Sequence, residues 1–136
     1  MQAFDLIPRT YEGRPVSLAH QFKLNGYYTV SIGKISHSPD GRRRGPSIQE
    51  TDAYDAGDTG EPELPFGWDE VYAPYGQWKT AWGAFFAYAG GKTRIPGKTS
   101  STEAADVPDT GYPDGLIAEE AVKKLRQLKD KPFFLA

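Results

Sequence analysis

The sequence predicts an α/β fold with a mainly parallel sheet. Two observations lead to this prediction: a helix followed by an apolar strand occurs near each end of the 136 residues, and the long segment between them is rich in glycine and proline. Helices that alternate with apolar strands are typical of layered α/β proteins. Two strands alone cannot cover both faces and both edges of a parallel sheet, so we expect this chain to be part of a larger domain.

The first helix–strand pair lies at residues 17–33. Ser17 can cap a short helix from Leu18 to Leu24, because its side-chain oxygen can accept from an N–H of the first turn. Asn25-Gly26 is a typical helix end, where the glycine can adopt a positive φ. The next residues, Tyr27 to Ile32, are β-branched and aromatic and predict a buried strand.

The segment between the two pairs predicts little regular structure. Residues 38–113 hold 11 of the 15 glycines and 8 of the 11 prolines, and both residue types interrupt helices and strands. We expect a long variable loop over residues 38–111, with ordered parts at 17–37 and 112–136. Within the loop, the spacing of Trp78, Trp82, Phe85 and Phe86 predicts one helix from Trp78 to Tyr88.

The second helix–strand pair begins with Asp114, which is a good N-cap. Its apolar stripe contains Ile117, Ala121, Leu125 and Leu128, while the charged residues lie mainly off the stripe. The run from Pro132 to Ala136 follows the helix and predicts a second buried strand.

Composition excludes several classes of function. The net charge is −2 with no basic cluster large enough for nucleic acid or an anionic membrane, and no apolar run approaches the ~20 residues of a membrane span. The chain has no cysteine, so it carries no disulfide, thiolate metal site or cysteine nucleophile. The first residues show no signal peptide.

Lys34 and His37 are the candidate site residues. Both follow the predicted strand at its carboxyl end, which is where ligands bind in open α/β sheets. Lys34 could hold an anionic group as a point charge, and His37 could exchange protons near neutral pH. The alternative interpretation is a surface lysine and a loop histidine. His20 lies inside the first helix, and we interpret it as structural.

Other clusters have plainer interpretations. Arg42-Arg43-Arg44 could clamp an anion, although a solvated turn is the commoner role of such a run. The acidic stretch from Glu50 to Glu70 lacks the alternating ligands and closing glutamate of an EF-hand loop, so we predict no calcium site there. Aromatic residues could stack on sugar rings or pack against the body of a larger domain; they are Trp68, Tyr72, Tyr75, Trp78, Trp82, Phe85, Phe86 and Tyr88.

Two blocks resemble the sulfatase family, in particular its iduronate-2-sulfatase-like branch. The stretch Leu18 to His37 (LAHQFKLNGYYTVSIGKISH) resembles the segment in which a helix ending in NGY precedes a strand and then GK-x-x-H. The block Tyr112 to Ala136 (YPDGLIAEEAVKKLRQLKDKPFFLA) resembles the later amphipathic helix that leads into PFFLA. The resemblance is specific over these two ends, and it implies that the chain is an internal piece of a sulfatase catalytic domain.

The resemblance implies an alkaline-phosphatase-like fold and hydrolysis of sulfate esters, on a sulfated sugar or polysaccharide. By the match to GK-x-x-H, Lys34 would bind a sulfate oxygen and the formylglycine nucleophile, and His37 would bind the formylglycine diol and assist sulfate release. The nucleophile motif and the calcium ligands lie outside this chain, so no metal ligand is assigned and the segment alone is expected to be inactive.

An extracytoplasmic location is expected. The alternatives are a phosphoester hydrolase of the same superfamily and an inactive remnant or carbohydrate-binding module.

Overall fold

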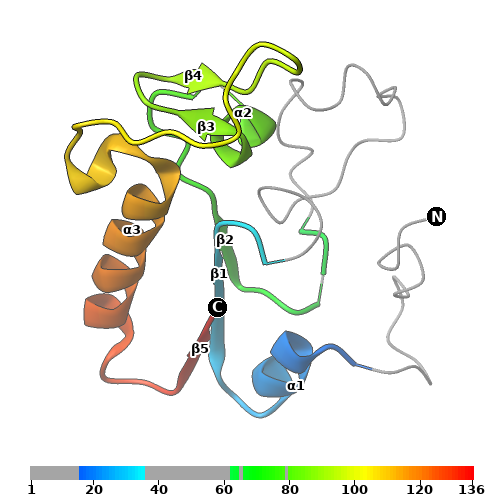
Figure 1. The fold of residues 1–136 in the computed structure, drawn as a ribbon. Helices are drawn as coiled ribbons and strands as arrows, with labels where there is room; N and C mark the ends of the chain where they lie inside the picture. Colours follow the sequence, from blue (N-terminus) through cyan, green and yellow to red (C-terminus); the bar gives the residue numbers. More distant parts are fainter. Residues whose placement is uncertain (1–15, 36–61, 65, 79) are drawn as a thin grey trace.

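The computed structural model describes residues 16–35, 62–64, 66–78 and 80–136. In these parts the chain forms two helices that pack on a three-stranded sheet, together with a smaller helix and hairpin (Figure 1). The mixed α/β architecture predicted from the sequence is confirmed.

Helix α1, Leu18–Leu24, forms where the sequence predicts it. The Ser17 hydroxyl accepts from the backbone N–H of His20 at 3.1 Å, which satisfies one of the free donors of the first turn. The helix ends at Asn25, and Gly26 has a φ of +80°. This left-handed residue turns the chain directly into the first strand.

The main sheet has the strand order β2-β1-β5, and all its strands are parallel. Strand β1, Tyr28–Ile32, is central; β2, Glu70–Tyr72, pairs Val30 with Glu70, and β5, Phe133–Leu135, pairs Tyr28 with Phe133. The predicted parallel sheet is therefore confirmed in the described residues. Strand β2 was not predicted, because three residues between prolines and glycines are too few for a sequence pattern.

One face of the sheet packs on the long helix α3, Pro113–Leu128, and forms the core (Figure 1). Val30, Ile32 and Leu128 are buried together there, and Ile117, Ala121 and Leu135 pack around them. Alternate residues of a strand point to opposite faces, so Tyr28, Val30 and Ile32 share the α3 side.

The other face of the sheet carries aromatic and polar residues on the side of α1. Phe134 of β5 stacks on Phe22 of α1 with ring centroids 4.4 Å apart, and on Trp68 at 5.9 Å. Thr29 and Ser31 of β1 are fully buried on this side. The Ser31 hydroxyl finds no hydrogen-bond partner among the residues described.

Helix α3 differs from the sequence prediction in two details. Tyr112 occupies the N-cap position and Pro113 begins the helix, so the prediction that Asp114 is the N-cap was wrong; Asp114 lies in the first turn, where its charge suits the helix dipole. Leu125 is 45% exposed whereas Lys124 is 6% exposed, so the predicted stripe is displaced by one residue near its end. Lys124 can be buried because it pairs with Glu70 of β2.

The predicted helix from Trp78 to Tyr88 is shorter than expected. Helix α2 covers only Ala81–Phe85, with the Thr80 hydroxyl capping it at Gly83 N–H, 2.9 Å away. The chain then forms an antiparallel hairpin of β3, Ala87–Tyr88, and β4, Lys92–Thr93. Gly90 and Gly91 have φ values of +71° and +73° and form the turn of this hairpin.

A 3-10 helix, η2, covers Asp109–Gly111 and leads into α3. In the part of the chain with described coordinates, no helix has both the length and the apolar character needed to cross a membrane.

Candidate functional site

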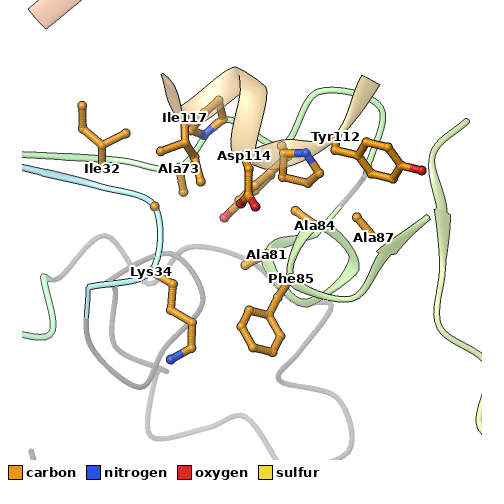
Figure 2. Close-up of a pocket in the computed structure, with 14 residues that line it drawn as sticks. Ile32, Lys34, Ala73, Ala81, Ala84, Phe85, Ala87, Tyr112, Asp114 and Ile117 are labelled. Atoms are coloured by element: carbon orange, nitrogen blue, oxygen red, sulfur yellow. The ribbon is translucent and has the colours of Figure 1, made fainter. Parts of the chain in front are cut away.

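A pocket of about 560 Å³ lies at the carboxyl ends of β1 and β2, between α2 and the first turn of α3 (Figure 2). We name it the strand-end pocket. Its lining comes from four parts of the chain: Ile32, Gly33, Lys34, Ala73, Pro74, Tyr75, Ala81, Ala84, Phe85, Ala87, Tyr112, Pro113, Asp114 and Ile117. The sequence places ligand binding at this edge of a parallel sheet, and the structure has a cavity there.

Gly33 brings Lys34 to the rim of the pocket. Gly33 is buried and has a φ of +76°, so the chain turns sharply as it leaves β1. A Cβ atom at this position would lie 2.7 Å from Cδ1 of Ile117 in α3, which is closer than packing allows. Glycine therefore lets the end of β1 approach α3 closely and turn toward the pocket.

Lys34 is exposed and extends along the pocket toward α2 (Figure 2). Its Nζ atom lies 5.5 Å from the centre of the Phe85 ring, within the range of a cation–π contact. The aromatic ring thus contacts the ammonium at the mouth of the pocket.

Asp114 adds a negative charge to the same pocket from the first turn of α3. Figure 2 shows its carboxylate projecting from the helix into the space above Ala81 and Ala84. Among the described lining residues, Lys34 is the cation and Asp114 the anion. The sequence indicated only a helix cap at Asp114 and no site residue, because its local pattern is that of a helix start.

His37, the second predicted site residue, lies outside the described residues, as does the cluster Arg42-Arg43-Arg44. The prediction that Lys34 and His37 share one site therefore stays a prediction. His20 stacks on Phe66 with ring centroids 5.7 Å apart and does not line the strand-end pocket.

The aromatic residues divide between the two roles considered from the sequence. Trp68 and Trp78 are buried at 7% and 2% exposure, which is packing. Phe85 and Phe86 are exposed, and Trp82 stacks on Phe86 at 5.5 Å. Phe85 lines the strand-end pocket, as do Tyr75 and Tyr112, so these are the aromatic rings that could contact a ligand there.

The last two residues of the acidic stretch have structural roles. Asp69 pairs with Lys23 at 2.7 Å and accepts two hydrogen bonds from Thr29. Burial alone would raise the pKa of Asp69, but the hydrogen bonds from Lys23 and Thr29 outweigh it and lower the pKa. This ionised carboxylate ties α1, β1 and the start of β2 together.

Glu70 is the centre of a second polar network on the α3 side of the sheet. Lys124 donates to it at 2.5 Å and Tyr28 donates at 2.5 Å, and Tyr72 donates to it as well. Burial opposes ionisation of Glu70, yet these donors lower its pKa to about 2. The hydrogen bond to this carboxylate, followed by burial, raises the pKa of Tyr28 to about 12. The network joins β2 to α3 below the pocket.

Metal-binding side chains do not gather anywhere in the described segments: no group of three His, Cys, Asp or Glu residues is close enough to hold an ion. The residues of the strand-end pocket therefore do not fit a calcium site by themselves.

The fold and pocket define an α/β protein with a pocket at the strand ends that is lined by one cation and one anion. In comparison with known proteins, the chain is 28% identical over 131 residues to iduronate 2-sulfatase of Mus musculus. The aligned region covers 94% of this chain and 20% of that protein. The chain thus spans about a fifth of the length of this relative. This similarity supports a distant, sulfatase-like relation. No family model and no solved structure matches the chain.

Proposed function

We propose that this chain is part of a sulfatase that hydrolyses sulfate esters, and that Lys34 binds a sulfate oxygen of the substrate. The observation that carries the proposal is the position of Lys34, which follows β1 at the rim of a pocket on the carboxyl edge of a parallel sheet. The partial similarity to iduronate 2-sulfatase supports the proposal that the anion bound by this cation is a sulfate ester. A larger alkaline-phosphatase-like sheet is the fold that we propose for the complete domain.

Lys34 would act as a fixed positive charge. A sulfate ester carries one negative charge, and more negative charge develops on its oxygens as the ester bond breaks. An ammonium group held at the rim by the turn at Gly33 and the ring of Phe85 is positioned before the substrate arrives, so it stabilises this charge without reorganisation.

His37 would assist release of sulfate from the nucleophile, as expected from the resemblance. In sulfatases of this kind the formylglycine nucleophile and the calcium ion would be supplied by other parts of the protein. The described residues offer no cluster of three metal ligands.

A phosphoester hydrolase of the same superfamily is the alternative. The charges of the pocket do not separate the two esters, because Lys34 would attract the more negative phosphate ester more strongly and Asp114 would repel it more strongly. The partial similarity to iduronate 2-sulfatase supports the sulfate ester.

The test is hydrolysis by the complete product of the gene that encodes this chain. We expect release of 4-methylumbelliferone from 4-methylumbelliferyl sulfate to be faster than from the phosphate ester. Lys34→Ala should lower kcat/KM for the sulfate by about 100-fold or more, the usual cost of a group that stabilises developing charge. Lys34→Arg should retain part of the activity, because it keeps the charge.

Lys129→Ala is the matched control, since its side chain is 70% exposed near the opposite end of α3. It should leave kcat/KM within about threefold of the unchanged protein. Unchanged sulfate hydrolysis in Lys34→Ala would exclude the assigned role of Lys34. Faster hydrolysis of phosphate would favour the phosphoester hydrolase, and failure to hydrolyse either ester would favour an inactive remnant or binding module.

A further inference from the structure

A second cavity, of about 580 Å³, lies on the β3–β4 hairpin beyond the N-terminal end of α3. We name it the hairpin pocket; its lining includes Tyr88, Lys92, Thr93, Thr99, Thr102 and Glu103. The volume is within the ~300–1,000 Å³ that is usual for small-molecule sites. Nothing in the proposed sulfatase chemistry uses this cavity.

The hairpin pocket and the strand-end pocket share a wall. Ala87 lines the strand-end pocket, and the next residue of β3, Tyr88, lines the hairpin pocket. The Tyr112 hydroxyl donates to Oε2 of Glu103 at 2.8 Å, and these two residues line one pocket each. Figure 1 shows this hairpin near the N-terminal end of α3. A ligand chain bound at one pocket is therefore adjacent to the other.

The lining of the hairpin pocket is rich in hydroxyl groups and has one carboxylate. Glu103 uses Oε2 to accept from the Ala89 N–H at 2.7 Å and from Tyr112, whereas no described residue donates to Oε1. The Thr102 hydroxyl also forms no hydrogen bond within the described parts of the chain. The Thr93 hydroxyl donates to the Phe86 carbonyl at 3.3 Å and keeps its acceptor capacity. Thr93, Thr102 and Glu103 are exposed and line the pocket, so these groups remain able to bond to a ligand.

The pocket also offers apolar surface of fixed orientation. The Tyr88 hydroxyl donates to the Ser100 carbonyl, which anchors the ring. Ile95 is 50% exposed beside it, and the Thr99 hydroxyl closes the 95–99 turn by bonding the N–H and carbonyl of Ile95 at 3.1 Å. A pyranose has hydroxyls around its edge and C–H groups on its faces, so it needs this combination of polar groups and an aromatic face.

We propose that the hairpin pocket is a binding site for an uncharged pyranose ring, held by Glu103 and Thr102 at its hydroxyls and by Tyr88 at its face. Glu103 and Lys92 give the lining one negative and one positive charge, so a ligand without net charge suits it better than a sulfated or carboxylated ring. The sugar site follows from this geometry alone. Its use by the sugar next to the sulfated one rests on the proposed function.

The ionisation of Glu103 agrees with this role. The hydrogen bond from the Ala89 N–H, and then that from Tyr112, lower the pKa of Glu103. The carboxylate therefore remains an acceptor for sugar hydroxyls throughout the neutral range.

Calorimetric titration of the complete gene product with three neutral tetrasaccharides tests the site: cellotetraose, maltotetraose and N-acetylchitotetraose. We expect at least one to bind saturably. Thr102→Val and Glu103→Gln should each weaken that binding by about tenfold. Thr102→Val removes a hydroxyl of the protein that would bond to the sugar, and Glu103→Gln removes a charged acceptor. Ser101→Ala, at an exposed neighbour outside the pocket lining, is the matched control and should leave the affinity unchanged.

The sugar site would be overturned if none of the three sugars binds saturably, or if all the variants bind with equal affinity.

A kinetic comparison separates this result from failure of the proposed function. If 4-methylumbelliferyl sulfate is hydrolysed, Thr102→Val should leave kcat/KM for this small ester unchanged and lower it about tenfold for a sulfated tetrasaccharide. Neutral sugar binding without hydrolysis of any sulfate would contradict the sulfatase and keep the sugar site. Equal kcat/KM losses for both esters would contradict the extended substrate.

Discussion

The ammonium of Lys124 lies 2.5 Å from a carboxylate oxygen of Glu70, and this ion pair joins the middle of α3 to the edge strand β2. The Lys124 side chain is 8% exposed and also donates to the Tyr72 hydroxyl at 2.7 Å. Burial would lower the pKa of Lys124, but the hydrogen bonds to Glu70 and Tyr72 outweigh it and raise the pKa. The pair therefore remains charged inside the packed interface.

Replacing Lys124 by methionine should destabilise the protein by about 2 kcal/mol, the usual cost of losing a hydrogen bond to a charged group. The loss should stay below that of a fully buried pair, because the Glu70 side chain is 25% exposed and keeps two tyrosine donors. Urea unfolding measures the change. Lys123→Met is the control, since its exposed pair with Glu120 should contribute less than about 0.5 kcal/mol. Equal effects of the two substitutions would contradict the assigned role of Lys124.

Stability should fall in acid because of Glu70. Its pKa is lowered from 4.5 to about 2 in the folded protein, so the unfolded chain takes up a proton first as the pH falls. The stabilisation is complete above about pH 4.5 and is lost progressively as the pH approaches about 2. Urea midpoints measured between pH 6 and pH 2 should show this loss.

Two variants separate the contributions of the carboxylates in acid. Glu70→Gln should flatten the fall in stability between about pH 4.5 and 2. Asp69→Asn should remove a further part of the fall, because the pKa of Asp69 is also lowered in the folded protein. A pH profile that Glu70→Gln leaves unchanged would show that the network does not hold Glu70 ionised.

Gly33→Ala should destabilise the protein more than Gly97→Ala. Both glycines have a positive φ, so each substitution carries a backbone cost of roughly 1–2 kcal/mol. A Cβ atom at Gly33 would also lie 2.7 Å from Ile117, whereas one at Gly97 meets nothing within 4 Å. The overpacking at Gly33 should add about 1–3 kcal/mol. Thermal unfolding of both variants measures the difference, and equal losses would contradict the close approach of β1 to α3.

Much of the fold could be predicted because its ends have strong local patterns. Ser17, Asn25-Gly26 and the run from Tyr28 to Ile32 mark a helix, its end and a strand by cap chemistry and composition alone. Strand β2 could not be predicted, because its three residues owe their conformation to pairing with β1 rather than to their own sequence. Helix α2 is shorter than predicted because Thr80 caps it at its start and residues 87–88 pair with residues 92–93 in a hairpin, and this pairing is not written in the helical spacing of the aromatic residues.

The site could be predicted only in part. Lys34, which lines the strand-end pocket, could be chosen as a candidate because it follows a strand that the sequence predicts clearly. The same pocket is also lined by Asp114, Phe85 and Tyr112, which are about 50 to 80 residues away in the sequence. A local sequence pattern cannot predict that such distant residues lie together. The burial of Lys124 was missed for the same reason, since its partner Glu70 lies in a strand that sequence patterns do not reveal.

The order β2-β1-β5 has a consequence for how the chain folds. The central strand pairs Val30 with Glu70 and Tyr28 with Phe133, positions that are 40 and 105 residues apart. The entropy of closing such loops must be lost before the pairing stabilises anything, so folding should be slow for a protein of this size. During synthesis on the ribosome, one edge of β1 must wait for residues 133–135 to emerge. Chaperone binding to that unpaired edge should therefore end only when β5 is available.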